Sequence, residues 1–460
     1  MSVGCVQQQA HNGTSETTNR YQENVNPQWV RLLSVLRMKV RYTRCLGAEL
    51  YSAEGRRYLD CLSGYCVHNT GHNHPYIIGA LKEELDRYGP AMVQTHALEL
   101  AGELAARLCA QAGGRLRKVF FCSSGSEGVE AAIKFARAHT ERDALLSLDG
   151  AFHGLTCGAL SLMGSSFWRE GFGSLLPGAE QLPFGSLEAL RAKLSTGRYA
   201  ALFLEPIQAE AGIRFLSTDY LREVQSLCRR FGTVLVADEV QTGLHRTGSF
   251  LASQQLGIDP GILVLAKALS GGLVPSGAVL MTDEIYDSVY GSLQRSIIHT
   301  STYSENALAM RAGLATLEVL DAECLGDRSS QLGVLLLQSL REKLTGFDMI
   351  KDVRGLGLFC GVEFGAPTQL RLRIPFESFL RIHPGMFGQM VVMRLFKEMG
   401  VLTQMCGNNF LVLKIAPPLV ATEEQIDEAV SAVRHVVETI HTSMAFWTDA
   451  LAIAGRVLNI

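Results

Sequence analysis

The sequence predicts an α/β protein with a large domain built on a mostly parallel sheet and a second, smaller α+β domain. The chain has 460 residues, more than one hydrophobic core usually organises. Through its middle, short apolar runs alternate with helical patterns, which is typical of a parallel sheet with crossover helices. After about Asn306, long helical stretches and isolated strands replace this alternation, so a second unit begins there.

Five segments follow from these changes of pattern. The first is polar and aperiodic, as terminal segments without a packed partner often are. We expect a flexible N-terminal segment, the first part of the small domain, the large domain, the rest of the small domain and a helical tail, over residues 1–25, 26–70, 71–306, 307–440 and 441–460.

The first part of the small domain should contain a helix and a hairpin. Apolar residues from Trp29 to Leu36 have helical spacing, which predicts a helix over Asn26–Met38. The sequence LGAELYSAEGRRYLDCLSG then predicts a β-hairpin that turns near Ala53-Glu54-Gly55.

The large domain should hold buried strands joined by helices, among them one containing Val129–Ala136 and one over Tyr220–Phe231. The strands are continuously apolar, so both faces of the sheet should be covered and functional residues should gather at strand ends. The predicted strands cover Lys118–Cys122, Ala144–Leu148, Ala200–Leu204, Thr233–Ala237, Ile262–Ala266 and Gly277–Met281.

Beyond the large domain, helical spacing predicts helices over Ala307–Leu320 and Gln331–Leu344. The segments KDVRGLGLFCGVEF and NFLVLKIAPPL should be strands, with an irregular insert rich in Phe and containing Pro between them. The tail from Ser443 has an apolar helical face, which we expect to pack on the body of the protein.

Composition and charge narrow the class of function. The formal net charge of −3 favours neither nucleic acid nor an anionic membrane as a partner, and a small-molecule ligand is expected instead. The 11 cysteines include no C-x-x-C pair, which indicates buried thiols in a reducing compartment and no metal site. With no secretory signal and no apolar run long enough to span a bilayer, we expect a cytoplasmic enzyme.

Two strand ends carry an acid and an amine. The strand in TVLVADEVQTG ends at Asp238, and the strand in GILVLAKALSGG ends at Lys267. Either residue alone is most often a surface charge, but neighbouring strand ends would place both on one edge of the sheet. Pyridoxal 5'-phosphate requires such a pair, because a lysine forms an imine with its aldehyde and an acid keeps its pyridine nitrogen protonated.

A phosphate-binding loop is also present. In KVFFCSSGSEGVEAAIKFA, a strand leads through small hydroxyl residues into a helix, whose first backbone N–H groups can bind phosphate. An ordinary helix cap at Ser126, with no ligand, explains the same pattern equally well.

An ordered set of motifs resembles the class III aminotransferases, which are fold-type I pyridoxal-phosphate enzymes acting on substrates such as ornithine, acetylornithine, GABA and putrescine. The resemblance covers roughly Asn26 to Val437. The motifs are SSGSEGVEAAIKFAR, GAFHGLTCGALSL, FLEPIQAEAGI, VLVADEVQTGLHRTGSF, VLAKALSGG and HTSTYSEN.

The resemblance implies a role for each matching residue. Lys267 would be the Schiff-base lysine and proton-transfer base, and Asp238 the partner of the pyridine nitrogen. The remaining cofactor contacts would come from Phe152 and Val240 on the two ring faces, Gln241 at the phenolic oxygen, His153 nearby, and Gly125 and Ser126 at the phosphate. Ser301 and Thr302 would reach that phosphate from a partner subunit, which implies a homodimer with shared active sites.

The residues expected to contact substrate depart from the family pattern. In many relatives a glutamate of the EPIQ motif, here taken as Glu205, pairs with an arginine before APPL that clamps a carboxylate. Lys414 replaces that arginine, and a lysine cannot make its planar two-bond contact. Tyr65 matches an aromatic residue of ornithine aminotransferases, whereas Leu155 stands where those enzymes carry an arginine.

We therefore expect an aminotransferase that takes an amino group from an ω-amine such as ornithine, putrescine or GABA and passes it to a keto acid or aldehyde by a ping-pong mechanism. An aminomutase or decarboxylase on the same fold, and a non-catalytic binding protein, are the alternatives. The segments FESFLRIHPGMFGQMVVMRLF and NNFLVLK resemble a subgroup that includes aminotransferase regions of prodigiosin-type pathways, which implies an apolar aldehyde or ketone acceptor as a further alternative.

Overall fold

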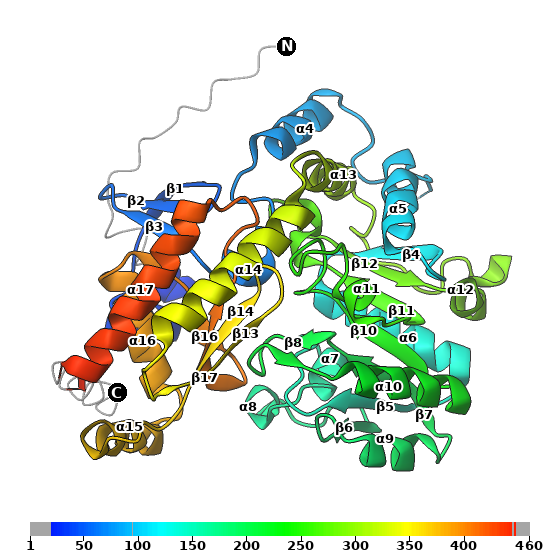
Figure 1. Ribbon diagram of the computed structural model, residues 1–460. Coiled ribbons are helices and arrows are strands. Elements are labelled where there is room, and N and C mark those ends of the chain that lie inside the picture. Colours follow the sequence, from blue (N-terminus) through cyan, green and yellow to red (C-terminus); the bar gives the residue numbers. More distant parts are fainter. Residues whose placement is uncertain (1–19, 94, 444–445, 448–460) are drawn as a thin grey trace.

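A seven-stranded sheet lies at the centre of the computed structural model, which describes residues 20–93, 95–443 and 446–447 (Figure 1). Its order is β4-β12-β11-β10-β7-β5-β6, and only β12 runs antiparallel to its neighbours. The strands are β4 (Lys118–Cys122), β5 (Ala144–Leu148), β6 (Ala179–Leu182), β7 (Tyr199–Leu204), β10 (Val234–Asp238), β11 (Ile262–Leu265) and β12 (Gly277–Met281). The predicted mostly parallel sheet is confirmed, and the polar edge strand β6 is the one that the sequence analysis missed.

Helices cover both faces of this sheet, which explains the continuously apolar strands. In β11, Ile262 and Val264 join the core cluster that includes α6 (Gly125–Thr140). Leu263 and Leu265 join the cluster of α5 (Glu99–Ala112) and α13 (Ala307–Ala322). Since neighbouring residues of a strand point to opposite faces, burial on both sides requires apolar residues at every position.

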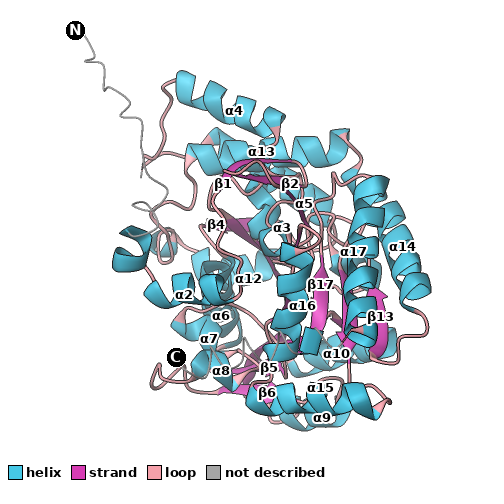
Figure 2. Cartoon of the chain, turned by 90° about the vertical axis from the view of Figure 1, so that its left-hand side faces the viewer, coloured by secondary structure: helices cyan, strands magenta, loops and turns pink. Residues whose placement is uncertain are grey.

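Two smaller sheets lie beside the central sheet, one antiparallel and one mixed. β13 (Ile350–Gly355), β14 (Cys360–Phe364), β17 (Asn409–Ile415) and β16 (Gln404–Cys406) form one sheet, and Figure 2 shows α14 and α17 beside it. The predicted hairpin is present as β2 (Glu49–Ser52) and β3 (Arg57–Asp60), flanked by β1 (Tyr42–Leu46) and β15 (Val401–Leu402). Strand β3 pairs with β15, so the N-terminal hairpin lies beside residues 401–402. This contact agrees with a small domain formed from the segments 26–70 and 307–440. The boundaries at residues 25, 70, 306 and 440 stay a prediction.

The five helices predicted before the tail are present, over Asn26–Met38, Val129–Ala136, Tyr220–Phe231, Ala307–Leu320 and Gln331–Leu344. The longer helices of the first 300 residues are α2 (Pro27–Val35), α4 (Pro75–Asp86), α5 (Glu99–Ala112), α6 (Gly125–Thr140), α9 (Leu187–Leu194), α10 (Thr218–Phe231) and α12 (Asp283–Tyr290). Later come α13 (Ala307–Ala322), α14 (Leu325–Leu344), α15 (Leu370–Ile382), α16 (Met386–Lys397) and α17 (Glu423–Thr442). Short elements are α3 (Ser63–Cys66), α7 (Cys157–Ser161), α8 (Ser166–Arg169), α11 (Ala252–Leu256), the 3₁₀ turns Lys267–Ser270 and Leu293–Arg295, and the two-residue strands β8 (Ile207–Gln208) and β9 (Arg214–Phe215).

The insert between β14 and β16 is helical, so the prediction of an irregular segment is wrong. It forms α15 and α16, and Pro375 lies inside α15. Leu372, Phe376 and Phe379 are buried at helical spacing on one face of α15, and their burial outweighs the lost backbone hydrogen bond of Pro375.

The described part of the tail packs on this insert. Trp447 is buried, its ring stacks on Phe379 with a centroid distance of 5.5 Å, and its Nε1 donates to the Ile440 carbonyl. The rest of the predicted helical tail lies outside the described residues. So do residues 1–19 of the predicted flexible segment over 1–25, whereas residues 20–24 are helical. Among the described helices, none combines the length and the apolar character that crossing a membrane needs.

Candidate active site

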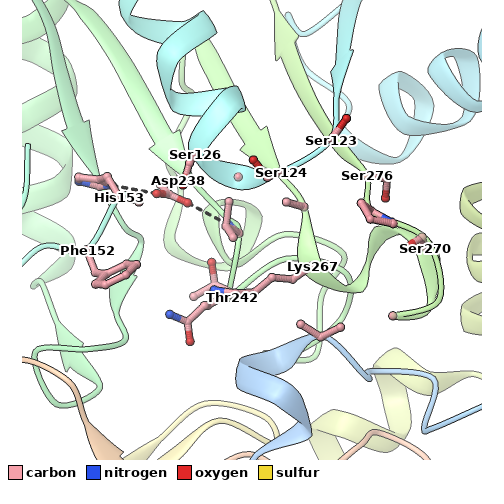
Figure 3. A pocket seen from close by; sticks show the side chains of 18 of the residues that line it. Ser123, Ser124, Ser126, Phe152, His153, Asp238, Thr242, Lys267, Ser270 and Ser276 are labelled. Atoms are coloured by element: carbon pink, nitrogen blue, oxygen red, sulfur yellow. Dashed lines mark hydrogen bonds and ion pairs between the residues drawn. The ribbon is translucent and has the colours of Figure 1, made fainter. Parts of the chain in front are cut away.

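The carboxyl ends of several strands meet at one edge of the central sheet and surround a cavity of about 570 Å³. β10 and β11 are neighbouring parallel strands with Asp238 paired to Val264, so Asp238 lies beside the strand that leads into Lys267. Both residues line the cavity (Figure 3). The prediction that the acid and the amine share one edge of the sheet is confirmed.

Lys267 occupies a strained backbone position. Its φ of +46° lies in the left-handed region, which a non-glycine residue seldom adopts, and such strain is found most often at functional sites. Burial of the amine lowers the pKa of Lys267 below its ordinary value of 10.5. A larger fraction of the amine is therefore unprotonated near neutral pH, and the unprotonated form is the nucleophile.

Asp238 is held by two hydrogen bonds, drawn as dashed lines in Figure 3. Its Oδ2 lies 2.8 Å from Nδ1 of His153, and its Oδ1 accepts the backbone N–H of Val240 at 3.1 Å. Burial would lower the pKa of His153, but the hydrogen bond and the charge of Asp238 outweigh it and raise that pKa above its ordinary value. The charge and the hydrogen bond of Asp238 thus favour the imidazolium form of His153.

The loop after β4 forms the other end of the cavity. Ser124 is the N-cap of α6, since its Oγ accepts the Glu127 backbone N–H at 3.2 Å. The alternative of Ser126 as the cap is therefore wrong. The Ser126 hydroxyl accepts the Leu155 backbone N–H at 3.3 Å and lines the cavity with Gly125. The backbone N–H groups at the start of α6 thus border a space with small side chains around it.

Gly154 makes this close approach possible. A Cβ on Gly154 would lie 2.3 Å from Ser126 Oγ, and its φ of +122° disfavours any side chain. A larger residue would push the Ser126 hydroxyl out of the loop.

A buried ion pair lies beside the cavity. Lys414, on β17, is fully buried and its Nζ donates to Oε1 of Glu210. Gln241 joins the pair, since its Nε2 donates to the same Glu210 oxygen at 3.1 Å and its Oε1 lies 3.5 Å from Lys414 Nζ. Burial would raise the pKa of Glu210, but Lys414 outweighs it and lowers that pKa to about 2. Burial would likewise lower the pKa of Lys414, whereas Glu210 raises it.

The glutamate–arginine pair described for relatives thus has no counterpart between Glu205 and Lys414, because Lys414 pairs with Glu210. Glu205 directly follows β7, and its carboxylate accepts the backbone N–H groups of Phe152 and Ala209, each at 3.0 Å. The turn between β8 and β9 carries Glu210 away from the central sheet to Lys414. Glu205 lines the cavity, but it faces β10 and not β17.

The other residues predicted to contact substrate lie near this pair. The Tyr65 ring centroid is 5.2 Å from Lys414 Nζ, and Tyr65 is 40% exposed. Behind the cavity residue Phe152, the Trp168 ring meets the Phe152 ring edge-on at 5.4 Å, and Trp168 Nε1 donates to the Asn408 side chain at 2.7 Å. Four residues at or near the site were not predicted from the sequence to have a role there: Glu210, Ser124, Trp168 and Asn408. The second acid in EPIQAEAG was the available clue to Glu210.

Ser301 and Thr302 do not line this cavity within one chain. Ser301 borders a separate hollow of about 120 Å³ with residues of the segment 90–98, and Thr302 is exposed. Their predicted role requires a second subunit and stays a proposal.

The donor set fits pyridoxal 5'-phosphate. Lys267 offers an amine, the Asp238–His153 pair a buried acid, and the start of α6 an anion-binding end at the opposite side. The hydroxyl of Ser276, which also lines the cavity, is buried and lacks a hydrogen-bond partner among the described residues. A ligand with acceptor oxygens would satisfy it.

Comparisons with known proteins agree with this geometry. The family model for class III aminotransferases matches residues 34–437. Aminotransferase PigE from Serratia sp. (strain ATCC 39006) is 35% identical over 458 residues, which cover 93% of this chain and 54% of PigE. The chain thus spans about half the length of this relative.

Two solved structures illustrate the similarity of fold. Ornithine aminotransferase from Toxoplasma gondii has a TM-score of 0.79 at 27% identity, over 94% of this chain and 99% of that chain. Acetylornithine aminotransferase from Elizabethkingia anophelis has a TM-score of 0.69 at 29% identity, over 87% of this chain and 94% of that chain. This chain belongs to the class III aminotransferases, fold-type I enzymes whose cofactor is pyridoxal 5'-phosphate.

Proposed function

We propose that this aminotransferase takes its amino group from an ω-amine such as ornithine, putrescine or GABA and passes it to a keto acid or aldehyde by a ping-pong mechanism. The observation that carries the proposal is the buried Lys414–Glu210 pair beside the cavity that holds Lys267. Because Glu210 neutralises Lys414, this lysine does not bind a carboxylate next to the reacting amine. The site therefore favours a substrate whose reacting amine lies far from any α-carboxylate.

The residues of the cavity would divide the work. Lys267 would hold the cofactor and move a proton at the substrate carbon, for which burial of its amine is favourable. Asp238, supported by His153, would face the ring nitrogen, and Phe152 and Val240 would enclose the ring. Gln241 would donate to the phenolic oxygen, and Gly125 and Ser126 would bind the phosphate. The bound cofactor supplies an electron sink for the carbanion that forms when the proton leaves.

An apolar aldehyde or ketone acceptor is the second candidate, favoured by the lining of the cavity. Among its described lining residues there is no arginine to clamp a carboxylate. Nearby, Leu155 is 52% and Phe167 66% exposed, and Phe167 packs on Trp168. These side chains offer an apolar surface to an uncharged chain.

Spectroscopic titration distinguishes these substrates. The loaded enzyme should lose its visible absorbance band when a productive donor converts the cofactor to its amine form. We expect putrescine and ornithine to remove the band at lower concentrations than glutamate, because Lys414 is paired with Glu210 and does not bind the α-carboxylate of glutamate.

The acceptors are tested on the amine form of the enzyme. Long-chain aldehydes and 2-oxoglutarate should restore the band if they are accepted. Efficient conversion by glutamate alone would contradict the proposed donor class, and failure of long-chain aldehydes with good ornithine turnover would exclude the second candidate.

Replacing Ser126 by alanine should weaken binding of pyridoxal phosphate about tenfold or more. A hydrogen bond to a charged group contributes about 1.5–3 kcal/mol, and 1.4 kcal/mol corresponds to a tenfold change in affinity. Absorbance titration of the apoenzyme measures the dissociation constant. The control is Ser186→Ala, which removes a helix cap at α9, away from the cavity. Equal affinities for wild type and Ser126→Ala would remove Ser126 from the phosphate site.

The proposed homodimer would complete the phosphate site with Ser301 and Thr302 of the second copy. Exposed apolar side chains accompany them on the same segment, with Leu293 91%, Ile297 78% and Tyr303 64% exposed. Light scattering after size-exclusion chromatography tests this assembly, and a monomeric active enzyme would contradict it.

A further inference from the structure

Glu205 is a buried acid for which the proposed mechanism has no use. It follows β7 at the position where Asp238 ends β10, because Leu204 and Ala237 are paired in the parallel register of these strands. It is 5% exposed and lines the cavity together with Asp238 and His153. Two carboxyl groups and one imidazole thus share the inner end of the cavity.

The environment of Glu205 allows its charge to change near neutral pH. The pKa of Glu205 is raised to about 7, mainly by burial. The charge of His153 lowers this pKa, and the charge of Asp238 raises it further. Both carboxylate oxygens accept backbone N–H groups, from Phe152 and Ala209, which stabilises the ionised form. The group can therefore act as a carboxylate without any side-chain cation bonded to it.

His153 links the two acids. Its Nδ1 bonds to Asp238, its Nε2 has no hydrogen-bond partner among the described residues, and the side chain is fully buried. The uncharged Phe203 ring packs near the imidazole, and the Met163 sulfur accepts the backbone N–H of His153. Lys267 also lines the cavity and interacts with the charge of Asp238, and Glu210 and Lys414 form their own pair beside the cavity. Glu205 and Asp238 are thus the acids that set the charge of His153.

We propose that Glu205 is a positioning residue that controls the charge of the His153–Asp238 pair at the inner end of the cavity. When Glu205 is ionised, it keeps His153 protonated, and the three groups together retain one net negative charge towards the ring nitrogen. When Glu205 is protonated, the His153–Asp238 pair is neutral as a unit, and the negative potential at the ring nitrogen is weaker. This role goes beyond the proposed choice of substrate and does not depend on it.

The test is an NMR titration of His153 in the full-length loaded enzyme, using ¹³C-labelled histidine and assignment by His153→Gln. In Glu205→Gln the midpoint of His153 should move to lower pH, because a stabilising negative charge is gone. The acidic limb of the pH profile of kcat should move with it. The visible band of the bound cofactor should also change its pH dependence.

Two variants separate charge from packing. Glu205→Asp keeps the charge but shortens the side chain, so it should lower stability and leave the His153 midpoint near the wild-type value. Glu239→Gln is the matched control, since Glu239 is also buried and accepts two backbone N–H groups, from Ala252 and Ser253, but does not line the cavity. It should lower stability without moving His153.

Unchanged His153 titration in a folded Glu205→Gln enzyme would overturn the proposal and leave Glu205 as a structural acceptor for Phe152 and Ala209. If that variant does not fold, ¹³C-labelled glutamate in the wild type decides the matter. A buried carboxyl that titrates together with His153 supports the proposal, and one that stays ionised without any effect on His153 contradicts it.

The pH dependence of stability gives a second measurement. A folded-state pKa raised from 4.5 to about 7 means that the native state binds more protons than the unfolded state in this window. The contribution of Glu205 is therefore fully present below pH 4.5 and is lost as the pH rises through about 7. Relative to Glu205→Gln, the wild type should lose stability over this range, and parallel curves would contradict the proposed titration.

Discussion

Replacing Lys267 by alanine should remove the visible absorbance band of the loaded enzyme and reduce kcat/KM by at least about 10³-fold. Proton transfer by a positioned side chain contributes about 10²–10⁴-fold, and loss of the amine also removes the attachment of the cofactor. Lys267→Arg should fail as well, because a guanidinium stays protonated and cannot act as the nucleophile.

Absorbance spectra and half-reaction rates with putrescine measure this effect. Lys193→Ala is the control, since Lys193 pairs with Glu180 near the surface and should leave both spectrum and rate unchanged. An alanine variant at residue 267 that keeps the band and the rate would show that another amine holds the cofactor.

The second large effect concerns stability, at the buried Glu210–Lys414 pair. Glu210→Gln leaves the Lys414 ammonium buried without a counter-charge, and breaking a buried pair from one side costs about 3–5 kcal/mol. The double variant Glu210→Gln with Lys414→Met should be much less destabilised, because no uncompensated charge remains. Urea unfolding of the wild type, Glu210→Gln, Lys414→Met and the double variant gives the coupling free energy.

The control for this cycle is the exposed pair of Arg191 and Glu223, at the surface of α9 and α10. Glu223→Ala should change the unfolding free energy by less than about 1 kcal/mol, as surface pairs usually do. Additive effects of the two buried substitutions would contradict the proposed coupling.

The same pair determines a pH window. The lowered pKa of Glu210 contributes stability that is present above its ordinary value of 4.5 and is lost as the pH falls to about 2. The raised pKa of Lys414 contributes stability that is present below its ordinary value of 10.5 and is lost at higher pH. Between pH 4.5 and pH 10.5, the pair therefore contributes its full stabilisation.

Local sequence patterns predicted most of the fold. The apolar runs located six strands of the central sheet, and helical spacing located α6, α10, α13 and α14. The insert at α15 was missed because Pro375 is a strong local signal against a helix, whereas the burial that overrides it depends on packing with residues distant in sequence. The edge strand β6 was missed for the opposite reason, since its partly polar sequence gives little local signal.

The sequence by itself determined that Asp238 and Lys267 end strands, and that small residues join β4 to α6. Parallel strands of one sheet end at the same edge, so local pattern was enough to bring these groups to one cavity. Which acid meets Lys414 was decided only by the tertiary structure. Glu205 and Glu210 are five residues apart, and both follow the same strand. The β8–β9 turn and the distant strand β17, which lies 204 residues along the chain from Glu210, select Glu210 for the ion pair and leave Glu205 beside His153. Such a choice depends on contacts between remote segments, which no local pattern encodes.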